Sequence, residues 1–115
     1  MEKWLNHQFE SSTGTTEEFA QFAKEFKAYI KKNLPTGYTL AAFNRGHFYI
    51  SGFIVNDETG KNAYFSTSDV RYFPGAWHDN ILVRTAEHEK DYTGGMNQFS
   101  KLPGLVAATE RLTTV

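Results

Sequence analysis

The first third of the chain has the clearest pattern of apolar and polar residues, and this pattern predicts a helix. Apolar residues recur at helical spacing and mark one face: Phe19, Phe22, Ala23, Phe26, Tyr29 and Ile30. Thr15 and Glu18 have the spacing of a capping box at the start of a helix. Pro35 and Gly37 indicate its end. We therefore expect a helix that lies between Thr15 and Pro35.

After Gly37 the pattern changes to that of strands. Short runs rich in aromatic and β-branched residues follow at 38–43, 47–55, 63–67 and 81–85. The connections among the first three runs are short, and this favours antiparallel neighbours because a parallel crossover needs about a dozen residues or more. The sequence thus predicts an antiparallel meander of about four strands.

The second of these runs, residues 47–55, has the composition of a central strand. It is apolar on both faces, with Phe48, Ile50 and Ile54 on one and Tyr49, Phe53 and Val55 on the other. Gly52 in its middle indicates a bulge or a close backbone approach. Before it, Asn44, Arg45 and Gly46 predict a compact hairpin turn in which Gly46 has a positive φ.

The end of the chain returns to helical spacing. One face carries Leu102, Leu105, Val106, Thr109 and Leu112, and Pro103 suits an early helical position. Residues 87–98 before it are predicted to form a polar loop. The predicted fold class is therefore α+β, an antiparallel meander sheet flanked by an N-terminal and a C-terminal helix. Residues 15–115 form a single domain, and residues 1–14 form an N-terminal arm.

Composition narrows the class of protein. The chain has 115 residues, of which 40% are hydrophobic and 16% aromatic, which suits one folded domain rather than a disordered segment. Its net charge is −1, without the positive excess typical of electrostatic nucleic-acid binders. The absence of cysteine excludes disulfides and thiolate metal sites. The start is polar and no apolar run approaches the roughly 20 residues of a membrane span, so we expect a soluble, cytoplasmic protein that does not bind membranes.

Two arginines and a glycine pair suggest the first candidate site. Arg71 and Arg84 lie near the ends of predicted strands, and the loop that follows contains Tyr92, Thr93, Gly94, Gly95 and Asn97. Arginine offers a planar fork to phosphate or carboxylate, and glycine lets backbone N–H groups come close, so these residues could form an anion pocket. The alternative is structural, because Arg71 and Arg84 could instead pair with Asp69 and Asp91 and fix the loop to the sheet.

Aromatic residues suggest a second candidate site. We expect that Tyr49, Tyr64, Tyr72, Phe73 and Trp77 cannot all be fully buried under two helices in so small a domain. Exposed aromatic side chains beside arginine are typical of protein–protein contact surfaces, and they also suit the stacking of single-stranded bases. Ordinary packing in the core and at its rim is the alternative.

Catalytic and metal-binding signatures are weak. The four histidines do not form an HExxH pattern, so neither a metal nor another cofactor is expected. A hydrolase-type site that combines Ser66, Ser68 or Asp69 with His47 or His78 is the alternative to a non-enzymatic protein, but the chain contains no GxSxG motif.

Several segments together resemble a known family. They are YISGFI at 49–54, YFS at 64–66, SDVR at 68–71, Trp77, NILVRTA at 80–86, DYTGG at 91–95 and Asn97. The chain resembles, over roughly residues 17–112, a family of small uncharacterised proteins from phages, plasmids and conjugative elements of Gram-positive bacteria. The resemblance implies an accessory protein of a mobile element and no catalytic residue. Small proteins of that origin often bind host machinery, for example as inhibitors of CRISPR or other defence systems.

Two functions therefore remain as hypotheses. The first is a non-enzymatic module that binds a host protein through an aromatic and arginine surface around Arg71, Trp77, Arg84 and Tyr92. The second is direct nucleic-acid binding, in which Arg45, Arg71 and Arg84 contact phosphates and Tyr49 or Trp77 stacks on bases. Counterion release would make the second mode fall steeply with salt, whereas an aromatic protein interface is much less sensitive.

Overall fold

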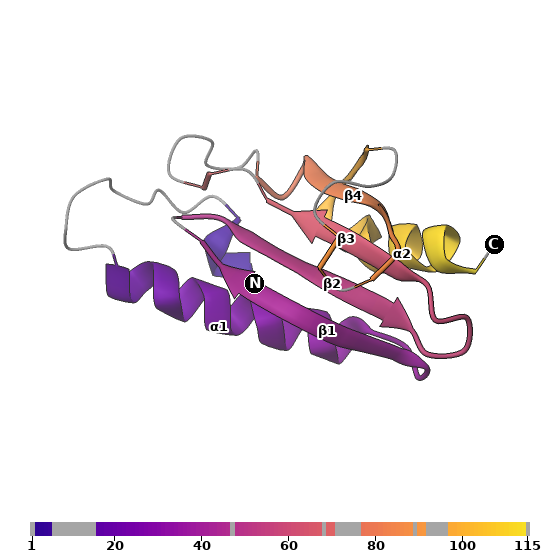
Figure 1. Ribbon diagram of the computed structural model, residues 1–115. Coiled ribbons are helices and arrows are strands. Elements are labelled where there is room, and N and C mark those ends of the chain that lie inside the picture. Colours follow the sequence, from indigo (N-terminus) through magenta and orange to yellow (C-terminus); the bar gives the residue numbers. More distant parts are fainter. Residues whose placement is uncertain are drawn as a thin grey trace.

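The computed structural model describes residues 2–5, 16–46, 48–67, 69–70, 77–88, 90–91 and 97–114. These residues form one five-stranded antiparallel sheet whose strands follow one another in chain order (Figure 1). The strands are β1 (Tyr38–Arg45), β2 (Ile50–Asn56), β3 (Asn62–Ser66), β4 (Ile81–Ala86) and β5 (Gln98–Ser100). The predicted α+β class, an antiparallel sheet with an N-terminal and a C-terminal helix, is confirmed.

Both helices lie on the same side of the sheet (Figure 1). They are α1 (Thr16–Asn33) and α2 (Leu105–Thr113), and the 3-10 turns η1 (Glu2–Trp4) and η3 (Leu102–Gly104) precede them. The predicted apolar stripe of α1 faces the core, because Phe22 and Phe26 are fully buried. None of the described helices is both long and apolar enough to cross a bilayer.

A single hydrophobic core joins the two helices to the sheet. Its members from α1, from the strands and from the C-terminal elements include Phe22, Phe26, Ile30, Ile50, Ile54, Phe65, Val83, Leu102, Leu105 and Ala108. Because an apolar side chain removed from water contributes about 1.5–3 kcal/mol, this shared core holds the layers together.

The side of the sheet away from the helices, called the outer side below, is organised around one row of side chains. The strand register places Phe53 of β2 opposite Tyr64 of β3, and Tyr64 opposite Arg84 of β4. Phe53 is fully buried, and its ring centre lies 5.0 Å from that of Tyr64. The prediction that the second strand is covered on both faces is therefore confirmed.

Of the two alternatives predicted at Gly52, the structure shows a close backbone approach, while the bulge lies in the neighbouring strand β1. The register of the β1–β2 pair shifts between Leu40 and Ala42 of β1, opposite Ile54 and Phe53, whereas Gly52 lies opposite Phe43. A Cβ atom on Gly52 would lie 2.5 Å from the carbonyl oxygen of Ala42 and 2.8 Å from the Phe65 ring. Only glycine fits between the bulged neighbour and the core ring.

The hairpin that joins β1 to β2 differs from the prediction. Strand β1 extends through Arg45 and β2 begins only at Ile50, so the turn is longer than residues 44–46. Gly46 does not have a positive φ, whereas Phe48 does, at 60°. A Cβ at position 46 would overlap the ring of Tyr49, so another residue there requires the exposed Tyr49 side chain to move.

The sheet also has one more strand than expected. Residues 98–100 form β5, which pairs with β4 through Ile81 and Ser100, Leu82 and Phe99, and Val83 and Gln98. Strand β5 has three residues and follows a polar connection, so its alternation is too short to show in the sequence.

Candidate functional site

Arg84 is buried between β3 and the connection that follows β4. It is 3% exposed, and its guanidinium lies 4.4 Å from the centre of the Tyr64 ring. Its Nη2 donates a hydrogen bond of 2.7 Å to the backbone carbonyl of Asp91, and its Nη1 donates to the carbonyl of Thr85. Arg84 therefore fixes the connection to the sheet, as the structural alternative proposed. Its assignment to an exposed contact surface is wrong.

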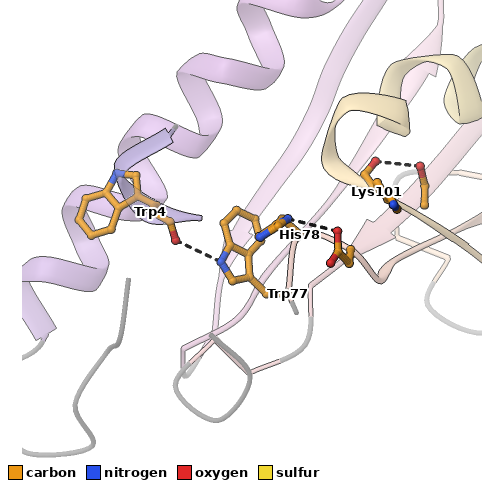
Figure 2. Close-up of polar contacts among 6 residues, drawn as sticks. Trp4, Trp77, His78 and Lys101 are labelled. Carbon is orange, nitrogen blue, oxygen red and sulfur yellow. Dashed lines mark hydrogen bonds and ion pairs between the residues drawn. The ribbon is translucent and has the colours of Figure 1, made fainter. Parts of the chain in front are cut away.

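Trp77 is also in the core and not at the surface. Its side chain is fully buried, and its ring centre lies 5.1 Å from that of Phe22 and 5.8 Å from that of Phe26. Its Nε1 donates to the carbonyl of Trp4, which closes the N-terminal turn over it (Figure 2). The expectation that Trp77 forms a contact surface is wrong because α1 and the N-terminal turn cover the indole.

Most of the remaining predicted site residues cannot be placed. Arg71, Tyr92, Gly94 and Gly95 lie outside the described residues, and so do Tyr72 and Phe73. Asn97 is exposed directly before β5. Because Arg84 is 3% exposed and two of its N–H groups already donate to the Asp91 and Thr85 carbonyls, its guanidinium is not open to an anion from solvent.

Phe99 is an exposed aromatic side chain that the sequence did not indicate as a candidate. Among the described residues, only Tyr49 and Phe99 are large apolar side chains that count as exposed, at 42% and 66%. Phe99 is the middle residue of β5 and lies opposite Leu82 on the outer side of the sheet. Its signal in the sequence, one aromatic residue in QFS, is too short to indicate a strand.

Strand β5 forms one edge of the described sheet. In the described sheet it has a strand neighbour on the β4 side only. The opposite edge, β1, contains a bulge and ends in the exposed Arg45, two features that oppose the addition of a strand. Strand β5 has no bulge, proline or charged residue within its three positions. It therefore combines an edge position in the described sheet with an exposed aromatic side chain.

A cavity of about 420 Å³ lies beside the chain segment that follows β5. It is lined by Leu5, Tyr29, His78, Asp79, Lys101, Leu102 and Pro103. A hydrogen bond of 2.7 Å from the Leu102 N–H to the His78 carbonyl joins two of its walls. Such a volume and a mostly apolar lining with a few polar groups suit a small molecule or a side chain.

The polar groups of this cavity carry both signs of charge (Figure 2). His78 Nδ1 lies 3.4 Å from a carboxylate oxygen of Asp79, while Lys101 is exposed. Nε2 of His78 is buried and has no hydrogen-bond partner among the residues that the structure describes.

Within the described parts of the chain, no cluster of three or more histidine or acidic side chains could hold a metal ion. His47 and Ser68, which the hydrolase alternative uses, lie outside those parts.

Comparison of the chain with protein-family models, with curated proteins and with solved structures gives no match.

Proposed function

We propose that the chain is a non-enzymatic interaction module that binds another protein at strand β5. The observation that carries the proposal is Phe99, an aromatic side chain that is 66% exposed in the middle of a strand at the edge of the described sheet. An extended segment of a partner can add to such an edge, where main-chain hydrogen bonds give affinity and side-chain contacts give specificity.

The surroundings of β5 support this mode of binding. On the outer side, half-buried Leu82 extends the apolar contact beside Phe99. The residue after Ser100 is Lys101, which lines the cavity described above together with His78. Phe99 would pack against the partner segment, and the cavity would take one of its side chains.

The class of partner in this proposal comes from the resemblance to proteins of mobile elements. Such a protein would bind a host protein, including one that processes nucleic acid or serves in defence, and would inhibit it as anti-CRISPR proteins do. Direct nucleic-acid binding receives less support, because Arg84, one of its three phosphate contacts, is buried and already hydrogen-bonded.

The test is a capture experiment from host lysate with the tagged full chain, with and without nuclease. The variant is Phe99→Lys, which places a charge at the centre of the edge. The matched control is Ala41→Lys, which places the same charge on an exposed residue of β1, at the opposite edge. Thermal unfolding of each variant establishes that it is folded.

The proposal predicts that a protein partner is captured in stoichiometric amount, with or without nuclease. The Ala41→Lys variant should still capture this partner, and the Phe99→Lys variant should not. Capture that nuclease abolishes would favour nucleic-acid binding instead. Equal capture by the two folded variants would remove β5 from the function.

A further inference from the structure

A second cavity, separate from the one beside β5, lies between the start of β3, the end of β4 and the end of α2. Its volume is about 440 Å³, and it is lined by Lys61, Asn62, Thr85, Ala86, Arg111 and Leu112. These residues come from three separate stretches of the sequence, so no local motif indicates the cavity.

The polar lining of this cavity is cationic. Lys61 and Arg111 bring two positive charges to it, and none of its lining residues is acidic. Among the described residues, neither cation has a carboxylate within salt-bridge distance. Two like charges around one cavity repel each other, and an anion placed between them relieves that repulsion.

Neutral groups of the lining add to the same chemistry. Asn62 is only 6% exposed, and its Nδ2 makes one long hydrogen bond, of 3.4 Å, to the carbonyl of Gly60. An amide nitrogen has two N–H donors, so Asn62 keeps donor capacity. The Thr85 hydroxyl is a further donor, while Ala86 and Leu112 form an apolar wall.

We infer that this cavity binds a small organic anion. Its phosphate or carboxylate group would lie between Lys61 and Arg111, and its apolar body would contact Ala86 and Leu112. Arginine and lysine bind either anionic group through charge-assisted hydrogen bonds, so the two sources share one recognition chemistry. Arg111 also donates a hydrogen bond of 3.4 Å to Gln98 of β5, but Phe99, which carries the proposed protein contact, does not line this cavity.

The test is a titration of the full chain followed by NMR at constant ionic strength. The probes are phenyl phosphate and benzoate, which carry the same ring and different anionic groups, and sodium chloride controls for general charge screening. We expect one or both probes to shift the side-chain amide signals of Asn62 and the backbone signals of Thr85 and Ala86. The probe that binds tighter identifies the preferred anionic group.

The variants are Lys61→Gln and Arg111→Gln, with Lys24→Gln on the exposed face of α1 as the control. Loss of one charged hydrogen bond should weaken binding about tenfold in the first two, with no change in the control. The inference fails if chloride gives the same shifts, if the shifts spread over surface lysines in general, or if all three variants bind equally. Because Phe99 takes no part in this test, its outcome is distinct from that of the capture experiment.

Discussion

The guanidinium of Arg84 lies over the ring of Tyr64, 4.4 Å from its centre, at the strand position directly opposite. The electron-rich face of an aromatic ring attracts a cation, and the attraction strengthens when water is excluded. The same guanidinium reaches the carbonyl of Asp91. Arg84 thus connects the outer row of the sheet to the segment that follows β4.

The first prediction concerns this arginine. Arg84→Ala should lower the free energy of unfolding by about 1–3 kcal/mol, because it removes a buried side chain and leaves the part-buried carbonyl of Asp91 without its donor. Urea denaturation measures the change. Arg45→Ala, at an exposed position of β1, is the control and should stay within about 0.5 kcal/mol of the wild type. Equal effects of the two substitutions would show that the contacts of Arg84 contribute nothing to stability.

Gly52 gives the second prediction. Gly52→Ala should destabilise the fold by about 1–3 kcal/mol, since the new methyl group would press against the Ala42 carbonyl and the Phe65 ring. Gly104→Ala is the control, because its nearest atom is the Ser100 hydroxyl, the end of a side chain that can rotate. Chemical denaturation of both variants gives the comparison, and a Gly52→Ala variant as stable as the control would contradict the close approach.

The third prediction is a coupling between Gly46 and Tyr49. Gly46→Ala should destabilise the protein because the added methyl group overlaps the Tyr49 ring. Tyr49 is 42% exposed, so Tyr49→Ala on its own should cost little. The double variant should recover most of the stability that Gly46→Ala loses, which gives a coupling free energy of about 0.5–3 kcal/mol in a double-mutant cycle. Additive effects would exclude the steric cause.

The fourth prediction concerns pH. A hydrogen bond from Gln21, with Trp4 and Lys3 adding to it, holds the pKa of Glu25 below its ordinary value of 4.5. A carboxylate whose pKa is lowered in the folded state stabilises that state at pH values above its ordinary pKa. The contribution is lost as the pH falls through the lowered pKa.

Thermal unfolding of the wild type and of Glu25→Gln measures this contribution. The difference between their midpoints should be constant near neutral pH and should shrink as the pH falls below 4.5. Gln21→Ala should reduce the same difference, because it removes the main cause of the shift. A difference that does not depend on pH would rule out the contribution of Glu25.

The sequence predicts those parts of the fold in which many residues repeat one pattern. The stripe of α1 predicts both its length and its buried face, and Gly52 predicts the close approach of β1 and β2 at this position. Strand β5 could not be predicted because three residues carry almost no periodicity. The positive φ of Phe48 could not be predicted either. Phe48 packs against Phe19, with 5.0 Å between the two ring centres.

The candidate site was harder to predict because burial depends on partners far away in the sequence. Trp77 follows a proline and a glycine, a context typical of surface turns, yet the stripe of α1 covers it. Arg84 lies in an apolar run on the outer side of the sheet, and only Tyr64 and Asp91 explain its burial. Phe99 has the opposite environment, since nothing described covers it.

The order of the strands has a consequence for how the chain folds. Every strand pairs with the strand next to it in sequence, so the sheet can grow hairpin by hairpin without the closure of a long loop. Other contacts close much longer loops. The hydrogen bonds from Asn56 and Thr59 to Thr113 span 57 and 54 residues, and the contact between Trp4 and Trp77 spans 73. Loop-closure entropy places this contact late on the folding route, after the meander has brought Trp77 to α1. Sheet formation should therefore be fast, and attachment of the N-terminal turn should be a separate, slower event.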